Sequence, residues 1–453
     1  MTLGWLLLRG LELVLREAAL FAGAGFALLG AEDLAVDLAW LAMRVRGLPE
    51  PPPPGPATTR VALFIPAWDE AAVIGPMLRA TLAALGPAEG PVYVGCYPND
   101  PETAAAAAEA ARGDPRVRLV VGPRPGPTSK ADCLNGLWEA LRAEEAAGAA
   151  RAEAVLLHDA EDVVHPAALS LVAGLVGRFD LVQLPVLPLI DPGSRWLGGH
   201  YADEFAQAHG KELVVRQALG AALPSAGVGC ALSRAALDAL AAAGGGRPFD
   251  ADSLTEDYEL GLRLAEAGGT AAFVRARAAD GSLIATREYF PGTLAGAVRQ
   301  KGRWIAGIAL AGWDRLGWRG GLAERWMRFR DRRALLAALL LLCGYAAAGA
   351  WLLLKLVEGL GGPAPAPLPP TLSWLLRLNL GLLLWRLGMR ALFTGRAYGW
   401  REGLRAVPRA AVANVVAILA AGAALARYRT ARRTGRNEWG KTEHRFPAGA
   451  GGG

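Results

Sequence analysis

The hydrophobic and polar positions of this chain describe a folded middle part between two apolar ends. From Val61 onward, short apolar runs of strand length alternate with longer stretches, rich in Ala and Leu, that have the length of helices. Such alternation predicts an α/β fold, with a mostly parallel sheet and helices on both of its faces. We expect strands at 61–65, 92–97, 117–121, 155–158 and 181–185, with helices that include 73–85, 102–112 and 131–149.

The apolar ends predict membrane helices. Residues 334–354 include no charged side chain over 21 positions, about 31 Å as a helix, which is enough to cross the hydrocarbon core. Residues 371–394 are a second candidate despite three arginines. The first 46 residues hold a further apolar stretch, and acids inside a spanning helix are costly, so we expect its acids to pair with arginines of later segments. These acids are Glu32, Asp33 and Asp37.

Basic residues predict which side of the membrane each part occupies. Arginines follow the first apolar segment and precede 334–354, so the middle part is expected in the cytoplasm. The tail from Arg427 to Arg445 carries seven basic residues and is expected on that same side. Three full spans after the middle part would place the tail outside. We therefore expect 405–427 to be an interfacial or re-entrant helix.

These patterns divide the chain into six parts. The middle part is the largest, and a stiff Pro-rich linker precedes it. In order, the parts are an N-terminal membrane helix region (1–46), the linker (47–59), the α/β domain (60–312), a basic interface segment (313–333), C-terminal membrane helices (334–427) and a basic tail (428–453).

Charge separates two classes of partner. The net charge is +6, but from Arg315 to the end 22 Arg and Lys face 6 Asp and Glu, a net +16, which leaves −10 on the first 314 residues. A nucleic-acid binder would carry its basic residues on the folded domain. Here they flank apolar segments, which argues against nucleic acid and indicates an anionic lipid bilayer. The four cysteines are widely spaced, without a CxxC pair, and are expected to be reduced.

Acidic residues follow two of the predicted strands. Ligands of parallel sheets bind at the carboxyl ends of strands, where Asp69-Glu70 ends the first run and Asp100 the second. Their carboxylates are placed to accept hydrogen bonds from a nucleotide base or ribose. The alternative for each is a helix N-cap.

Lys130 and an acid cluster predict a diphosphate and a metal ion. Lys130 lies between a Gly/Pro-rich loop and a helix, where it can meet a diphosphate; the alternative is a surface lysine. Three acids, Asp159, Glu161 and Asp162, end a buried strand and repel one another unless a cation such as Mg²⁺ neutralises them. The alternative is an acid cluster at a helix start.

Two further motifs lie beyond residue 250. Thr255-Glu256-Asp257 precedes an amphipathic stretch, so it is either a catalytic acid pair or a helix start capped by Thr255. Gln300, Arg303 and Trp304 share one helical face, which offers a sugar-stacking plane beside hydrogen-bond donors. A membrane-interface helix with a Trp anchor is the alternative.

The order of these motifs resembles the inverting family 2 glycosyltransferases of GT-A fold. More narrowly, runs such as Val61–Gly75, Pro224–Gly229, Arg287–Pro291 and Trp439–Pro447 resemble the phage N4 adsorption protein B family of bacterial inner-membrane glycosyltransferases. The resemblance implies a Rossmann-like GT-A domain with Asp257 as the base and Glu256 beside it. It implies donor binding by Asp69, Glu70, Asp100, Lys130, Asp159 and Arg303, acceptor binding by Gln300, Arg303 and Trp304, and a metal held by Asp159 with Glu161 or Asp162.

The implied reaction is a single displacement with inversion. A UDP-sugar, with UDP-N-acetylhexosamine as the first choice, would donate its sugar to a lipid-linked or growing polysaccharide with Mg²⁺ or Mn²⁺. The resemblance further implies a multi-pass inner-membrane protein with a cytoplasmic catalytic domain, exopolysaccharide production, an outer-membrane or export partner, and regulation linked to cyclic di-GMP. The alternative is a catalytically weak scaffold or phage-receptor component. The complete acid set of Asp159, Glu161 and Asp257 argues against it.

Overall fold

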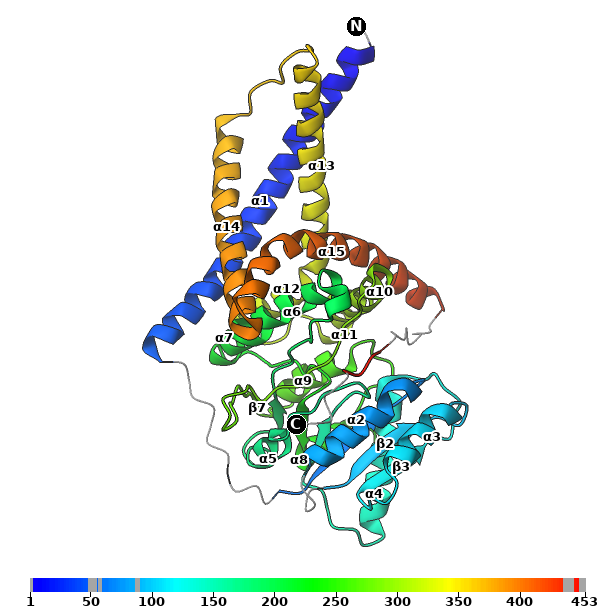
Figure 1. Ribbon diagram of the computed structural model, residues 1–453. Helices are drawn as coiled ribbons and strands as arrows, with labels where there is room; N and C mark the ends of the chain where they lie inside the picture. The colour runs from blue at the N-terminus through cyan, green and yellow to red at the C-terminus, as the bar shows by residue number, and fades with distance from the viewer. Residues whose placement is uncertain (1–2, 48–54, 56–58, 86–89, 435–443, 448–453) are drawn as a thin grey trace.

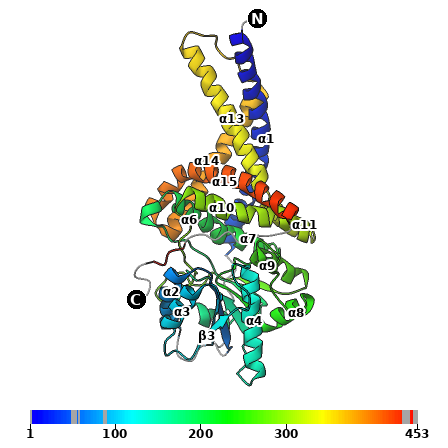
Figure 2. The same ribbon diagram turned by 90° about the vertical axis from the view of Figure 1, so that its right-hand side faces the viewer.

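The computed structural model describes residues 3–47, 55, 59–85, 90–434 and 444–447. Three long helices stand on a layer of shorter helices, and a sheet domain lies below that layer (Figures 1 and 2). The Pro-rich linker falls mostly outside the described residues, as does 435–443 of the basic tail.

The sheet has seven strands in the order β3-β2-β1-β4-β6-β5-β7 among the described residues. The first four strands pair in parallel, whereas β6 is antiparallel to both β4 and β5. The mostly parallel sheet expected from the sequence is thus confirmed, while β6 and β7 were not anticipated. The strands are β1 (Val61–Pro66), β2 (Val92–Cys96), β3 (Val117–Val121), β4 (Ala154–Leu157), β5 (Leu181–Gln183), β6 (Cys230–Ser233) and β7 (Ala271–Phe273).

Helices cover both faces of the sheet. Every residue of β1 is buried, and alternate side chains point to opposite faces, as in a central parallel strand. Leu63 and Ile65 pack with α2 and α3, whereas Phe64 packs with α4 and α8 on the other face. Apolar burial on both faces holds the carboxyl ends of β1 and β4 at one rigid edge. The helices of these layers are α2 (Ala71–Ala84), α3 (Pro101–Ala110), α4 (Lys130–Ala146), α5 (Ala168–Ala173), α8 (Arg234–Ala243) and α9 (Glu256–Glu266).

A layer of helices separates the sheet from the long helices (Figure 1). Two π-helical turns interrupt it, η2 after α6 and η3 after α10, and such turns are frequent at functional sites. The layer comprises η1 (Pro192–Ser194), α6 (Leu197–Gln207), η2 (Ala208–Glu212), α7 (Leu213–Ala218), α10 (Leu294–Ile305), η3 (Ala306–Ala311), α11 (Gly312–Leu316) and α12 (Leu322–Arg332).

The long helices α1 (Leu3–Arg46), α13 (Ala334–Gly359) and α14 (Pro370–Tyr398) lie against one another. Leu15 and Ala19 of α1 are buried in one cluster with Ala347 of α13, and Asn379 of α14 donates a hydrogen bond to the Gly23 carbonyl at 2.9 Å. By length and composition, α1, α13 and α15 (Trp400–Thr434) are apolar enough to cross a membrane, whereas α14, which contains the candidate span expected at 371–394, is not among the helices that meet this criterion. These apolar helices indicate a membrane protein.

Helix α15 lies across the lower part of the long helices, on the side nearer the sheet domain (Figures 1 and 2). It packs on α6 and α10: Val416 is buried with Tyr201 of α6, and a Cβ on Gly302 of α10 would lie 3.1 Å from the Ala423 Cβ. Arg409, 1% exposed, pairs with Asp203 of α6 at 2.9 Å. Its composition would permit a span, and the interfacial or re-entrant placement of 405–427 stays a prediction.

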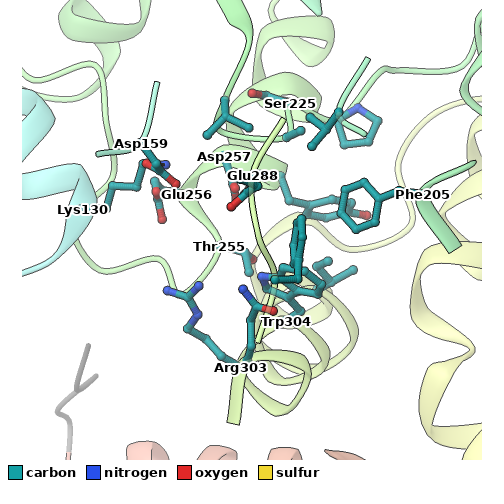
Figure 3. Close-up of a pocket in the computed structure, with 18 of the residues that line it drawn as sticks. Lys130, Asp159, Phe205, Ser225, Thr255, Glu256, Asp257, Glu288, Arg303 and Trp304 are labelled. Carbon is teal, nitrogen blue, oxygen red and sulfur yellow. Dashed lines mark hydrogen bonds and ion pairs between the residues drawn. The ribbon is translucent and has the colours of Figure 1, made fainter. Parts of the chain in front are cut away.

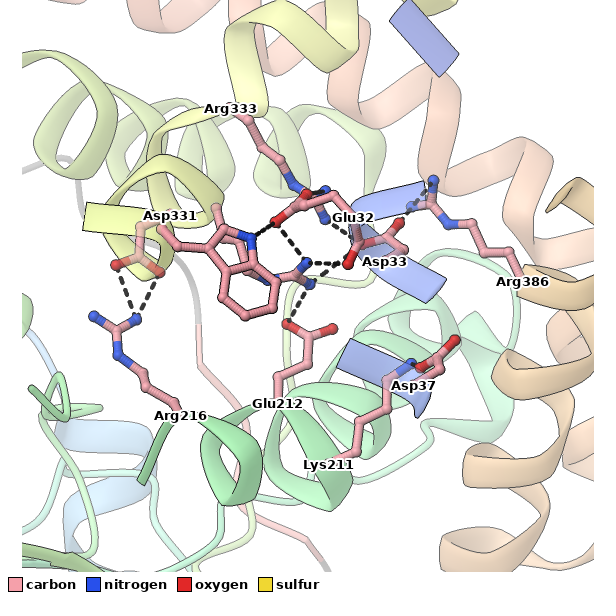
Figure 4. A network of polar contacts seen from close by, with 11 residues as sticks. Glu32, Asp33, Asp37, Lys211, Glu212, Arg216, Asp331, Arg333 and Arg386 are labelled. Atoms are coloured by element: carbon pink, nitrogen blue, oxygen red, sulfur yellow. Dashed lines mark hydrogen bonds and ion pairs between the residues drawn. The ribbon is translucent and has the colours of Figure 1, made fainter. Parts of the chain in front are cut away.

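A buried ion network joins α1 to α12 and α14 (Figure 4). Glu32 accepts from Arg330 at 2.8 Å, and Asp33 contacts Arg333 at 2.6 Å and Arg386 of α14 at 3.8 Å. One turn further on, Asp37 pairs with Lys211 of η2. The acids Glu32, Asp33 and Asp37 of the first apolar segment therefore have basic partners, as predicted, and these pairs fix α1 to α12, α14 and η2.

Candidate active site

A cavity of about 360 Å³ opens at the carboxyl ends of β1 and β4, between the sheet and α10 (Figure 3). It gathers side chains from segments far apart in the sequence. Nine of the predicted site residues line it: Glu70, Lys130, Asp159, Glu161, Glu256, Asp257, Gln300, Arg303 and Trp304. Asp69, Asp100 and Asp162 are not among its lining residues.

Lys130 is the cation at one side of this cavity. Ser129 caps α4, and Lys130 as its first residue contacts Asp159 at 2.5 Å and donates to the Gly227 carbonyl at 3.2 Å. Burial alone would lower the pKa of Lys130, but the carboxylates of Asp159, Glu256 and Asp257 outweigh it and hold that pKa above its usual range. Lys130 is therefore a fixed positive charge among acids, unlike a surface lysine.

Glu256 and Asp257 form the first turn of α9 opposite Lys130. Thr255 occupies the N-cap position but makes no side-chain cap hydrogen bond. Burial raises the pKa of Asp257, and burial with the adjacent Asp257 raises the pKa of Glu256 to about 7. A carboxylate with a raised pKa is a stronger base.

Gly227 allows Asp257 and Lys130 to approach each other. Its φ of +75° lies in the left-handed region, and a Cβ there would lie 2.6 Å from Asp257 Oδ2 and 3.2 Å from Lys130 Nζ. No other residue type fits this loop, because both the backbone angle and the space exclude a side chain.

In the acid cluster after β4, the side chains of Asp162 and Glu161 point in different directions. Asp162 turns inward, where its Oδ2 lies 2.7 Å from His158 Nδ1 and accepts from the Asp159 amide at 3.0 Å. These bonds shape the turn. The sequence left open whether Glu161 or Asp162 joins Asp159 at the metal, and Asp162 does not line the cavity. Glu161 does face it, and burial raises the pKa of Glu161 to about 8.

His444 of the tail completes a three-residue cluster in this cavity. Its Nδ1 lies 2.8 Å from Glu70 Oε1 and 3.2 Å from Glu161 Oε1, and Phe446 packs on the core two residues later. One ligand atom from each of the three residues lies within 4.8 Å of the others. Burial lowers the pKa of His444, but the carboxylates of Glu161 and Glu70 outweigh it and raise that pKa to about 9. Two buried carboxylates thus face one cation position, which the imidazolium of His444 takes here; a divalent ion bound there would displace the proton of His444 and leave a neutral imidazole as a third ligand.

The opposite end of the cavity is aromatic. Trp304 lines it and packs with Tyr201, Phe205 and Phe290 at centroid distances of 6.1–6.4 Å. Within the described part of the chain, three residues that line this cavity each carry a buried polar atom without a hydrogen-bond partner, and buried polar atoms are normally satisfied. They are Thr255 Oγ1, Gln300 Oε1 and Arg303 Nε. Unsatisfied donors and acceptors beside an aromatic plane are suited to a sugar.

Asp69 and Asp100 lie at the strand ends but support the loop. The Asp100 carboxylate accepts from the Thr103 amide at 3.2 Å as an N-cap and from the Asp69 amide at 2.5 Å. Both of its oxygens are used, so the helix-cap interpretation of Asp100 fits the structure better than the ligand one. Asp69 is exposed, with a φ of +54°.

Two cavity residues were missed by sequence reasoning. Glu288 lines the cavity, and burial followed by the charges of Asp162, Glu161 and Asp159 raises its pKa well above the ordinary value. His444 lies 283 residues from Glu161 in sequence. Both fall within runs that carried the family resemblance, Arg287–Pro291 and Trp439–Pro447, which was the available signal.

An acidic cavity at the carboxyl edge of a mostly parallel sheet is the arrangement of an α/β enzyme, and comparison with known proteins identifies the family. A protein-family model described as "Glycosyltransferase like family 2" matches residues 56–307. Bacteriophage adsorption protein B of Escherichia coli strain K12 is 38% identical over 418 residues, which cover 86% of this chain and 55% of the relative. Bacteriophage N4 adsorption protein B of E. coli O157:H7 gives the same values. This chain therefore belongs to glycosyltransferase family 2.

A solved structure shares the fold. The mannosyltransferase PcManGT from Pyrobaculum calidifontis, solved with GDP-mannose and Mn²⁺, has a TM-score of 0.53 and 21% identity, covering 89% of this chain and 99% of the other. At this identity the likeness establishes the fold alone. The chain spans little more than half the length of the two curated relatives.

Proposed function

We propose that this protein moves a sugar from a nucleoside diphosphate sugar to an acceptor at the membrane by a single displacement with inversion. The observation that carries the proposal is one cavity holding a half-buried lysine–aspartate pair, a carboxylate with a raised pKa and an aromatic wall. UDP-N-acetylhexosamine is the proposed donor, and exopolysaccharide production the proposed role. Lipid-linked or growing polysaccharide is the proposed acceptor, because Trp304 of the aromatic wall belongs to α10, which packs directly beneath α15.

Each group has a proposed task. Lys130 faces the diphosphate, where its charge stabilises the leaving group. Asp257 takes the proton from the acceptor hydroxyl, with Glu256 beside it, and the hydroxyl oxygen attacks the anomeric carbon from the face opposite the diphosphate. Arg303, Gln300 and Trp304 orient the acceptor. Asp69 remains a proposed contact to the base or ribose.

The metal set differs from the one the sequence suggested. Glu161, Glu70 and His444 are the proposed ligands, with Asp159 near the diphosphate beside Lys130. A divalent ion bound there would supply positive charge to the departing diphosphate. Mg²⁺ prefers oxygen ligands alone, so the imidazole favours Mn²⁺.

Donor turnover tests the proposed function directly. Purified protein in detergent is expected to release nucleoside diphosphate from one UDP-sugar in a panel of UDP- and GDP-sugars, only with Mn²⁺ or Mg²⁺, and faster when acceptor is present. A variant carrying Asp159→Asn should be folded and inactive. Release that is unchanged in EDTA would contradict the metal-dependent mechanism, and absence of turnover with every donor would favour the scaffold alternative.

The membrane arrangement is a second proposal. We place the catalytic domain and the tail in the cytoplasm of a bacterial inner membrane, with α1, α13 and α14 spanning it. The contacts of His444 with Glu70 and Glu161 support this, because the tail must reach the catalytic cavity. Alkaline phosphatase, active only after export, is expected to be active when fused at Pro365 and inactive when fused at Pro447. Activity of the second fusion would refute the arrangement.

A further inference from the structure

A second cavity, of about 520 Å³, lies beside the cytoplasmic ends proposed for α1 and α14. Five arginines line it, from the two long helices and from the segment after β7, and its lining includes no aspartate or glutamate. They are Arg44, Arg275, Arg277, Arg287 and Arg396. None of the motifs assigned to sugar transfer uses these side chains.

Acids do not neutralise these five arginines. Arg287 is half-buried and the other four are exposed, so solvent reaches all five side chains. Across the described residues, no salt bridge joins any of the five to a carboxylate. Arg275 and Arg277 donate only to carbonyls, those of Gly210 and Gly281. Burial, then the positive charge of Arg277, lowers the pKa of Arg275. The cavity therefore gathers five guanidinium groups that pair with no carboxylate of the described residues.

The position of the cavity indicates where such an anion comes from. Arg44 is in the last turn of α1 and Arg396 is in the last turn of α14. Both guanidinium groups lie over the Trp40 ring, 5.9 and 5.5 Å from its centroid. Tryptophan and arginine at helix ends mark the depth of lipid headgroups, and basic pockets at the cytoplasmic side of membrane helices bind anionic headgroups.

We propose that this cavity binds the phosphate group of an anionic phospholipid. Guanidinium groups bind phosphate oxygens through paired, charge-assisted hydrogen bonds, and several converging arginines give a site that selects phosphate over neutral headgroups. The lipid's acyl chains would lie along α1 and α14. This proposal does not depend on the proposed sugar transfer.

The bound headgroup would rest against the wall of the catalytic cavity. His209 of η2 lines both cavities, and its Nδ1 accepts from the Val186 amide at 3.1 Å. Val186 and Phe205 line the catalytic cavity, whereas their neighbours Leu187 and Ala206 line the arginine cavity. One layer of residues thus separates the two cavities. A bound lipid would therefore fix the position of the catalytic domain relative to the membrane surface.

Lipid retention measures this site without any activity assay. The full chain is incorporated into nanodiscs of phosphatidylcholine with or without phosphatidylglycerol, then released into detergent, and bound lipid is counted by native mass spectrometry. Phosphatidylglycerol is expected to be retained in preference to phosphatidylcholine. The double variant Arg275→Gln, Arg287→Gln should retain it about tenfold or more weakly, since two charge-assisted contacts are lost.

A matched double variant serves as control. Arg151→Gln with Arg247→Gln removes the same charge from exposed positions away from both cavities and should leave lipid retention unchanged. Equal loss in both variants, or none in either, would overturn the proposal by reducing it to general surface charge. Displacement of the lipid by millimolar inorganic phosphate, dependent on Arg275 and Arg287, would overturn the lipid as occupant and leave a soluble phosphate site. Equal melting temperatures establish that both variants are folded.

Discussion

Replacing Asp257 by asparagine is expected to lower sugar transfer by about a thousandfold or more while donor affinity stays within about threefold. The asparagine keeps the shape of the side chain but cannot accept the proton of the acceptor hydroxyl. Asp257 lies in the first turn of α9 with one oxygen bonded to the Tyr258 amide at 2.7 Å, and the other approaches Gly227 and Lys130. Its effect should therefore appear in kcat rather than in donor binding.

Two measurements separate a base from a donor ligand. Donor affinity is measured by calorimetry with the UDP-sugar and Mn²⁺, and transfer is measured under saturating donor. The control Asp238→Asn removes a carboxylate that lies on α8 outside the cavity and should change neither value. If Asp257→Asn weakens donor binding as much as it slows transfer, Asp257 contacts the donor and another group, with Glu256 first in line, is the base.

The sheet and most of the cavity residues could be predicted because the apolar runs that predict the strands are directly followed by the polar residues that line the cavity. Each strand of the parallel half reads as an apolar run, and residues that follow such runs must meet at one edge of the sheet. The expected strands agree with β1 to β4 to within one residue at either end. The strands β6 and β7 carry no such signal, since Ala, Cys and Ser occupy most of their positions in place of the Val and Leu residues that mark β4 and β5.

What the sequence left out depends on contacts between distant segments. His158 fixes the direction of the Asp162 side chain. The sequence Asp159-Ala160-Glu161-Asp162 alone would equally permit Asp162 to face the cavity. Glu288 belongs to no regular element, and its role depends on a burial that only the folded chain creates. The acids of α1 illustrate the opposite case: the cost of charge in an apolar helix predicted partners, although it could not specify Arg330 and Arg333.

Replacing Glu161 by glutamine is expected to weaken Mn²⁺ binding by about a hundredfold or more and to remove transfer. Glutamine retains one oxygen but loses the charge that a divalent ion requires, and Glu161 is one of two buried carboxylates facing the same point. The loss should be seen in the affinity for Mn²⁺ alone, measured by electron paramagnetic resonance without donor. Metal binding is thus tested independently of sugar transfer.

Replacing His444 by alanine tests the contribution of the tail to the same site. One ligand of three is lost while both carboxylates remain, so Mn²⁺ affinity is expected to fall by about tenfold to a hundredfold. His165→Ala is the matched control, because that imidazole bonds Ser282 at 3.0 Å outside the cavity and should leave Mn²⁺ affinity unchanged. Unchanged affinity in His444→Ala together with loss in Glu161→Gln would assign His444 to ion pairing with Glu70 and Glu161 instead. A fall in both variants would establish that the tail, 283 residues beyond the acid cluster, closes the metal site.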